Sequence, residues 1–450
     1  MNMKKIQLLS IVLMLTGLAS AQTYPVDTIK YMGSLDKYIN LVFLGDGYLD
    51  SEMDVFAEDA RNATEKFFSI SPWKHYENYF NVFMIKTPSE ERGATHTSDS
   101  PVNNFYGTTY GYNNIDRLLY PKSLTATRKV LTDNFPQYDV VVMIVNDEKY
   151  GGAGSTALMT FSKATQSIEI FYHEVGHGFA NLADEYWLDG YQSERPNMTQ
   201  VSDRESVKWK NWVGSEDIDV YPFPENDSWY RPHQACRMQY LYRDYCAVCR
   251  QAIVEAIHKH VNPIDSYEPD EKELRIGNNS DMTFKLNLIK PNPNTLEVTW
   301  MLNGETLDNQ QDTISINDSI LAEGNNELVA MVEDTTSLIR IDNHATIHSH
   351  SVHWQLQRDE SSNVNLLQSV RTDFVIYPVP FESQLKVSCS NANHPMQVVL
   401  ADLMGTTVVK SQTNKEGVCI LSTNHLANGV YVLSIYDNGK LTYSRKVTKK

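Results

Sequence analysis

At 450 residues the chain is too long for one ordinary domain, and its length predicts about three folded units. Its composition, 41% hydrophobic and 21% charged, is typical of globular proteins. The formal net charge of −17 argues against nucleic-acid binding and against docking on anionic lipid, because both partners attract a basic surface.

The first 21 residues, MNMKKIQLLSIVLMLTGLASA, have the pattern of a secretory signal peptide. Two lysines precede an apolar run from Ile6 to Leu18, and Ala19-Ser20-Ala21 fits a cleavage site that requires small residues. The rest of the sequence has no apolar run of transmembrane length, so we expect no membrane-spanning segment in the mature protein.

The cysteines predict disulfide bonds, because exported proteins meet oxidising surroundings in which disulfides persist. An odd number is present, so at least one is unpaired: Cys236, Cys246, Cys249, Cys389 and Cys419. We expect Cys236 to pair with Cys246 or Cys249, and Cys389 to pair with Cys419. A metal ion on Cys246-Ala-Val-Cys249 is the alternative that an exported protein makes less favourable.

Strands and helices alternate over residues 22–263, which predicts an α/β or α+β catalytic domain with a mixed sheet. Apolar segments predict three strands, at residues 37–48, 78–88 and 138–147. The last of these is so continuously apolar that both of its faces should be covered. Apolar periodicity predicts a helix over residues 51–68, and a closing helix occupies residues 250–261.

The pattern of apolar and polar residues changes after residue 263. Over residues 264–360, apolar and polar residues alternate between turns rich in Asn, Gly and Asp, which predicts an all-β sandwich of the immunoglobulin or fibronectin type. Residues 361–372 are polar and predict a linker. Residues 373–450 again consist of short β segments and predict a small C-terminal β-sandwich.

The strongest chemical signal is HEVGH at residues 173–177, an HExxH pattern of the kind found in zinc proteases. On a helix, His173 and His177 share one face and can bind one zinc ion. Zinc lowers the pKa of a bound water towards about 7, and Glu174 can take a proton from that water. The helix is apolar on most sides, and buried histidines without a partner are unfavourable, which favours a metal site over a solvated helix.

The third zinc ligand is not the usual one of the HExxHxxGxxH zincins, because Ala180 and Ala183 occupy the glycine and final histidine positions. Asn181 is the non-glycine residue best able to adopt a left-handed conformation, so we predict that the helix ends there. That turn would return Asp184 to the metal, whereas a straight helix would place it about 10 Å away along the axis. Glu185 is the alternative ligand.

A second segment with candidate site residues is ACRMQYLYRDYCAVCR at residues 235–250. The HExxHxxGxxH zincins have a methionine turn beneath the metal, and Met238 is the candidate here, as a packing residue and not a ligand. This segment also holds the candidate hydrogen-bond donors for a tetrahedral oxyanion. They are Tyr240 and Tyr242, with Tyr245, Arg237 and Arg243 as alternatives that spacing alone does not separate.

Several segments in this order resemble the bacterial immunoglobulin A (IgA) peptidase family of zinc metallo-endopeptidases, which is metzincin-like: LVFLGDGY, VVMIVNDEKYGGAG, HEVGHGFANLADEY and CRM…YCAVCR. The resemblance covers roughly residues 38–360. It implies a zincin-like fold, one catalytic Zn²⁺ and a protein or peptide substrate. It further implies His173, His177 and Asp184 as ligands and Glu174 as general base. Members usually carry glycine where this chain has Asn181.

The C-terminal segments resemble the sorting domain of the type IX secretion system of Bacteroidota. They are YPVP from Tyr377, LADLMGTTV and LANGVYVLSIYDNGKLTYSRKV. Val379 departs from the usual YPNP. The resemblance implies that the type IX machinery exports the protein, which is then secreted or attached to the cell surface. An ordinary β-sandwich binding module is the alternative.

We therefore predict a secreted zinc endopeptidase. The alternative is a surface adhesin or glycan-binding protein that uses a zincin scaffold and β modules only for binding, and the intact Glu174 argues against it. We further expect an edge strand at Val141–Asn146 and the glycines of residues 151–154 to bind substrate backbone by strand addition. Asp46, in the segment GDGY, is expected to have a structural role.

Overall fold

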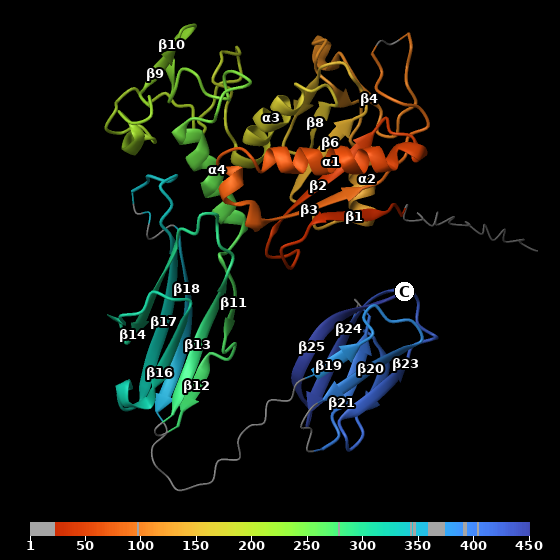
Figure 1. Cartoon of the computed structure of the whole chain (residues 1–450), viewed down its shortest axis with the longest axis vertical. Coiled ribbons are helices and arrows are strands. Elements are labelled where there is room, and N and C mark those ends of the chain that lie inside the picture. The colour runs from red at the N-terminus through yellow and green to blue at the C-terminus, as the bar shows by residue number, and fades with distance from the viewer. Residues whose placement is uncertain are drawn as a thin grey trace, which may run out of the picture. The chain divides into compact units, whose positions relative to one another are not determined.

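The computed structural model describes residues 23–96, 99–277, 280–342, 344, 348–358, 374–389, 394–402 and 405–450. The predicted signal peptide (1–21) and linker (361–372) lie outside these residues. The chain forms two compact units, Met1–Glu360 and Ser361–Lys450, which are described separately (Figure 1). In the described part of the chain, no helix has both the length and the apolar character needed to cross a membrane.

The first unit is built on a six-stranded mixed sheet with the order β1-β3-β2-β6-β8-β7. Its strands are β1 (Val26–Lys30), β2 (Ile39–Asp46), β3 (Phe80–Ile85), β6 (Val140–Val145), β7 (Gly152–Gly154) and β8 (Met159–Ser162). The four central strands are parallel, and each edge strand is antiparallel to its neighbour. The three predicted strands are confirmed, as is the mixed α+β character of this region.

Helices cover both faces of this sheet, as the apolar central strands require. Three helices share one hydrophobic core with Leu41 and Phe43 of β2 (Figure 1): α1 (Met53–Phe67), α3 (Ile168–Ala180) and α4 (Ala247–His260). The intervening Val42 and Leu44 point to the opposite face, where α2 (Thr125–Asn134) packs. The helices predicted at 51–68 and 250–261 are thus confirmed as α1 and α4.

Two short strand pairs lie outside the main sheet. They are β4 (Thr108–Thr109) with β5 (Tyr120–Pro121), and β9 (Tyr221–Phe223) with β10 (Asn226–Arg231). The second pair belongs to the long segment between α3 and α4, which Figure 1 shows as loops above α4. Within this segment, the Asn197 side chain hydrogen-bonds with the backbone of Ala183, close to the C-terminal end of α3.

The remainder of the first unit is a β-sandwich, so the predicted change to β structure is confirmed. One sheet has the order β11-β13-β16 and the other β12-β18-β17-β14-β15. Trp300 and Trp354 are fully buried between them with nearly parallel rings. The strands are β11 (Ile264–Glu268), β12 (Glu273–Ile276), β13 (Asp281–Leu288), β14 (Leu296–Leu302), β15 (Glu305–Thr306), β16 (Thr313–Asn317), β17 (Asn325–Asp334) and β18 (Ser349–Arg358).

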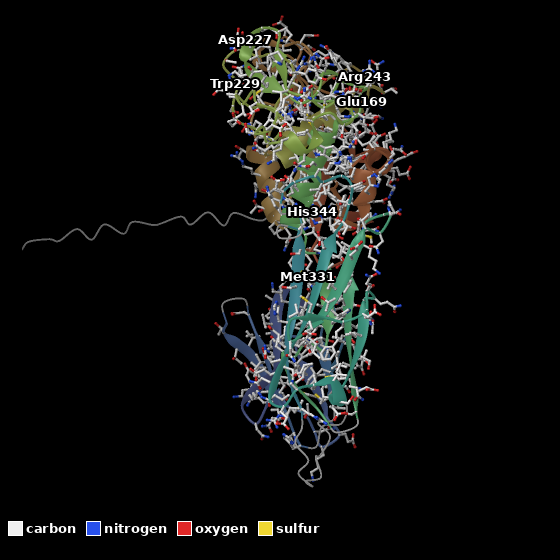
Figure 2. The ribbon with its side chains drawn as sticks, turned by 90° about the vertical axis from the view of Figure 1, so that its left-hand side faces the viewer. Glu169, Asp227, Trp229, Arg243, Met331 and His344 are labelled. Carbon is white, nitrogen blue, oxygen red and sulfur yellow. The ribbon has the colours of Figure 1, made fainter. Side chains whose placement is uncertain are left out.

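Asp334, fully buried at the end of β17, joins the sandwich to the helical part of the same unit. Its carboxylate accepts hydrogen bonds from the Tyr76 hydroxyl at 2.7 Å and pairs with Nε2 of His258, in α4, at 2.9 Å. Figure 2 shows His344 at this junction and Met331 further along β17. Burial raises the pKa of Asp334, but the hydrogen bonds from His258, Thr295 and Tyr76 and the charge of His258 together outweigh it and lower the net pKa.

The second unit is a small β-sandwich, as predicted. Its sheets have the orders β19-β20-β23 and β22-β21-β24-β25 around a core that includes Phe381, Leu385, Val398 and Leu433. The strands are β19 (Phe374–Tyr377), β20 (Gln384–Cys389), β21 (Gln397–Ala401), β22 (Thr407–Gln412), β23 (Val418–Ser422), β24 (Gly429–Asp437) and β25 (Lys440–Lys449). The predicted domain boundaries at residues 263, 360 and 372 remain predictions.

Candidate active site and metal centre

Helix α3 ends at the residue that the sequence predicted. Asn181 has the left-handed dihedral angles φ 54° and ψ 33°. The N–H groups of Asn181 and Leu182 donate to the carbonyls of His177 and Gly176, both at 3.1 Å. The chain therefore reverses direction after α3 and brings Asp184 back towards the two histidines.

Replacing Asn181 by alanine should destabilise this turn, because a left-handed conformation costs an L-residue about 1–2 kcal/mol and asparagine tolerates it better. We expect Asn181→Ala to lower the free energy of unfolding by about 1 kcal/mol in urea titrations. Asn181→Gly is the matched control and should leave it unchanged or raise it slightly. Equal stability of the two variants would contradict this account of the helix end.

The returning chain places three potential ligand atoms together. Nε2 of His173 lies 2.9 Å from Oδ1 of Asp184 and 3.0 Å from Nε2 of His177. Nε2 of His177 lies 3.2 Å from the same carboxylate oxygen. Two imidazoles and one carboxylate form a donor set suited to catalytic zinc.

The hydrogen bonds of the other ring nitrogen, Nδ1, in each histidine indicate that a cation fits this site. Nδ1 of His173 lies 3.0 Å from the carbonyl oxygen of Arg237, and Nδ1 of His177 lies 2.7 Å from that of Leu182. A carbonyl only accepts hydrogen bonds, so each Nδ1 carries the hydrogen. In neutral rings both Nε2 lone pairs then face each other and the carboxylate. Three acceptors this close are stable only around a cation, either a metal ion or added protons.

The pKa shifts show how strongly the site attracts positive charge. Burial lowers the pKa of His177, but the hydrogen bond to Asp184 and its negative charge outweigh burial and raise the pKa to about 9. Burial raises the pKa of Asp184, but the hydrogen bonds from His173 and His177 outweigh it and lower the net pKa. A divalent cation would take the place of the proton that His177 otherwise holds.

Glu174 faces the same cavity as the three potential ligands. The cavity measures about 370 Å³ and is lined by Glu174, His173, His177 and Asp184, with residues of the segment 186–198 on its far side. A Cβ atom on Gly154, in β7, would lie 2.5 Å from Oε2 of Glu174 and 2.6 Å from its Cβ. Only glycine therefore fits at position 154, and its backbone supports the Glu174 side chain.

The edge strand beside the cavity is β7, so the expectation of an edge strand at Val141–Asn146 is wrong. That segment forms β6, which pairs with β2 on one side and β8 on the other. The glycine segment, which was expected to bind substrate backbone together with that strand, itself supplies the edge strand, and Gly154 lines the cavity. The sequence does not predict which strand lies at the edge of the sheet, because the strand order depends on pairing between distant segments.

Gly154→Ala should lower catalytic efficiency without removing the metal. The new methyl group would displace Glu174, and a misplacement of about 1 Å can cost about 10²-fold in rate. The ratio kcat/KM on a peptide substrate and the zinc content measure the two effects. The control is Gly277→Ala, whose methyl group would meet only the Ser280 hydroxyl, at 3.4 Å. Undiminished activity in Gly154→Ala would show that β7 does not position Glu174.

Met238 lies beneath α3, where the sequence placed it. It is fully buried, and a Cβ atom on Gly176, between the two histidines, would lie 2.9 Å from its Sδ. The Met238 carbonyl accepts a hydrogen bond from the backbone N–H of Glu185 at 2.7 Å. The methionine turn therefore supports both the helix that carries the histidines and the loop that carries Asp184.

The structure does not bring Tyr240 and Tyr242 to the cavity. Their side chains are 52% and 57% exposed, and neither belongs to the described residues that line it. The backbone N–H of Tyr242 instead donates to Glu169, which also pairs with Arg237 at 2.5 Å. Figure 2 marks Glu169 and the exposed Arg243 at this end of the unit. The Tyr245 hydroxyl is buried and donates to the carbonyl of Tyr172.

Tyr186, which lines the cavity together with Tyr191, was not predicted as a site residue. Its ring lies nearly parallel to that of His173, with centroids 6.5 Å apart, and it lines the cavity. Burial, followed by the charge of Asp184 and a hydrogen bond to it, raises the pKa of the Tyr186 phenol. Its position could have suggested a place in the site, because it follows the predicted ligand Asp184 by two residues, on the loop that was expected to return to the metal.

Asp46 has the structural role expected of it. Its buried carboxylate accepts hydrogen bonds from the N–H groups of Gly47 and Tyr106, at 3.0 Å each, and from the hydroxyl of Thr108 at 2.7 Å. These bonds fasten residues 106–108 to the end of β2. Burial raises the pKa of Asp46 despite these hydrogen bonds.

Glu185, the alternative ligand, points away from the histidines into a buried group of cysteines. Its Oε1 accepts a hydrogen bond from Nδ2 of Asn197 at 3.0 Å and lies 3.2 Å from Sγ of Cys249. Burial raises its pKa well above the ordinary range for a carboxyl group. All five cysteines are free thiols in the structure, so neither predicted disulfide pairing is present in it.

Two family models match this chain. The model described as IgA peptidase M64 matches residues 28–227, and that of the secretion system C-terminal sorting domain matches residues 375–450. The first match includes β2, α3 and the loop with Asp184. Peptidases of this family are metallopeptidases. The second match indicates export by the type IX secretion system to the cell surface or beyond it.

Other similarities are partial. An endo-acting ulvan lyase from Formosa agariphila is 26% identical over 97 residues, which are 22% of this chain and 19% of that enzyme. The SGBP-B protein of a Bacteroides ovatus mixed-linkage glucan utilization locus has a TM-score of 0.15 at 14% identity, covering 39% of this chain and 42% of its own. Bacteroides uniformis β-glucuronidase 3 has a TM-score of 0.17 at 9% identity, covering 72% and 46%. TM-scores this low carry no structural argument.

Proposed function

Residues 28–227 belong to the IgA peptidase M64 family, and from this premise we propose that the protein is an exported, zinc-dependent endopeptidase. The observation that carries the proposal is the convergence of His173, His177 and Asp184 beside Glu174 in one open cavity. The mixed sheet, with its antiparallel edge strand next to the helix of the two histidines, supports a zincin-like catalytic domain over residues 22–263.

In this proposal, His173, His177 and Asp184 would hold Zn²⁺. When bound, the ion would supply a Lewis acid that polarises the scissile carbonyl and lowers the pKa of water towards about 7. Glu174 accepts a proton from the attacking water on a carboxylate oxygen and delivers it to the leaving nitrogen. Strand β7, whose Gly152 N–H already donates to the carbonyl of Arg117, would offer the backbone of Gly154 to the extended substrate.

Tyr186 takes the place of Tyr240 and Tyr242 as the candidate donor to the oxyanion. Its phenol lines the cavity and stays protonated, because burial and Asp184 raise its pKa. We expect Tyr186→Phe to lower kcat by about 10²-fold, as the loss of one oxyanion donor does elsewhere. Tyr240→Phe and Tyr242→Phe are the matched controls and should retain full kcat. The opposite ranking would return the role to the exposed tyrosines.

The substrate class is tested by incubating the mature protein with a peptide library and identifying the products by mass spectrometry. Cleavage at internal peptide bonds, lost on chelation and restored by Zn²⁺, is the expected result. Removal of single residues from peptide ends would contradict an endopeptidase. A protein that binds zinc but cleaves no peptide or protein would favour the surface adhesin or glycan-binding alternative.

A further inference from the structure

A second group of metal-ligating side chains lies outside the candidate active site. It consists of Glu185, Cys236, Cys246 and Cys249, which are all buried. One ligand atom from each lies within 4.8 Å of the corresponding atoms of the other three. We propose that these residues bind a second metal ion, a structural Zn²⁺. It is distinct from the ion proposed for His173, His177 and Asp184, which together are called the histidine centre.

The sulfur positions agree with shared coordination. Sγ of Cys236 lies 3.6 Å from Sγ of Cys249. Two thiolates on one tetrahedral zinc ion, each at about 2.3 Å, are about 3.8 Å apart, whereas disulfide sulfurs are about 2.05 Å apart. The backbone N–H of Cys246 points at Sγ of Cys236 from 3.3 Å, as a donor to a thiolate would.

Glu185 supplies an independent indication of a missing ligand. Its Oε2 is buried and has no hydrogen-bond partner among the described residues, while Oε1 faces Cys249 and Asn197. A buried carboxylate oxygen without a partner is unfavourable, and a metal ion would provide that partner. The buried guanidinium group of Arg231 donates to the backbone oxygen of Glu185 and holds this residue in place.

The sequence spacing and the helix geometry suit soft-metal binding. Cys246 and Cys249 form a C-x₂-C pair, a spacing typical of zinc sites. Cys246 is the N-terminal cap of α4, and Cys249 lies in its first turn. The positive end of a helix stabilises negative charge placed there, as on metal-bound thiolates. Three cysteines and one carboxylate complete four-coordination with no open position, which defines a structural site.

The proposed ion would connect three segments that build the active site. Glu185 follows Asp184, so consecutive side chains point into the two centres. Cys236 stands two residues before Met238, whose carbonyl holds the N–H of Glu185. Cys246 and Cys249 fix the start of α4. The second ion would therefore position Asp184 and the methionine turn without contacting the substrate.

Cobalt substitution tests the proposal on the full mature chain. Co²⁺ bound to thiolates gives an intense near-ultraviolet charge-transfer absorption that a site of histidines and aspartate does not give. We expect about two metal ions per chain and this absorption in the unmodified protein. Cys249→Ser should remove the absorption and one of the two ions. Cys389→Ser, in the second unit, is the matched control and should change neither.

His177→Ala separates this proposal from the proposed function, because it should remove the histidine-centre ion and leave the thiolate absorption intact. Peptide mapping without reduction covers the case in which Cys249→Ser fails to fold. Three free thiols at positions 236, 246 and 249 after denaturation in chelator support the site. A disulfide between any two of them, with a single metal ion that His177→Ala removes, would overturn it whether or not the protein is a peptidase.

Discussion

Glu174→Gln should abolish most peptide hydrolysis and leave the zinc in place. The amide keeps the shape of the side chain but cannot accept the proton from water, and such proton transfers contribute about 10²–10⁴-fold to the rate. We expect kcat/KM on a fluorogenic peptide to fall by about this factor. Zinc content should stay equal to that of the unmodified protein, because Glu174 is not among the converging ligand atoms.

The matched control for this variant is Glu65→Gln, which makes the same change at an exposed position of helix α1. It should change neither activity nor zinc content. Full activity in Glu174→Gln would remove Glu174 from the mechanism. A loss of zinc together with activity would instead make Glu174 a ligand.

Asp184→Ala should empty the histidine centre. The carboxylate oxygen lies 2.9 Å and 3.2 Å from the two Nε2 atoms, and its charge is the only negative one among the converging ligand atoms of the described residues. Loss of a residue that merely supports a ligand costs about 10–100-fold in metal affinity, so loss of the ligand itself should cost more than about 10²-fold. Competition with a zinc-binding dye measures the affinity.

Glu185→Gln is the comparison for Asp184→Ala, because it changes the neighbouring carboxylate that faces the cysteines. The affinity of the histidine centre should fall far less in this variant. If Glu185→Gln emptied the histidine centre while Asp184→Ala retained its metal, the assignment of the third ligand would be reversed.

The parts of the site that the sequence revealed are those set by local geometry. His173 and His177 share a helix face at any position in a protein, because they are four residues apart. Few residues other than glycine adopt a positive φ, and asparagine is one of them. Asn181 could therefore be identified as the helix end. The reversal there, together with the short distance to Asp184, restricted the third ligand to two neighbouring carboxylates. Local geometry favoured Asp184 and left Glu185 as the alternative, and in the structure Asp184 faces the two histidines.

The parts that the sequence did not reveal depend on contacts between distant segments. Strand β7 has three residues, two of them glycine, so no apolar pattern marks it as the edge beside Glu174. Helix α2 buries only Thr127, Val130 and Leu131, too few for a clear periodicity. Tyr240 and Tyr242 lie close to Met238 in sequence, but spacing does not show that their side chains point to solvent.

The cysteines show the same limit. Pairing by proximity in sequence favoured a disulfide, because Cys236, Cys246 and Cys249 lie within one short segment. The fourth member of the group, Glu185, comes from the loop after α3 and becomes visible only when that loop packs against α4. With this carboxylate beside the three thiols, the group has the four ligands of a candidate metal site, whereas the sequence had predicted a disulfide.

The proposed zinc-dependent peptidase activity is tested most directly by its recovery as zinc is returned to the metal-depleted protein. Occupancy of the histidine centre by zinc can be followed by anomalous diffraction from crystals of the same preparations. We expect activity to rise in proportion to the occupancy of the centre formed by His173, His177 and Asp184, and to be complete at one ion in that centre. Peptide cleavage that persists with this centre empty would contradict the proposal.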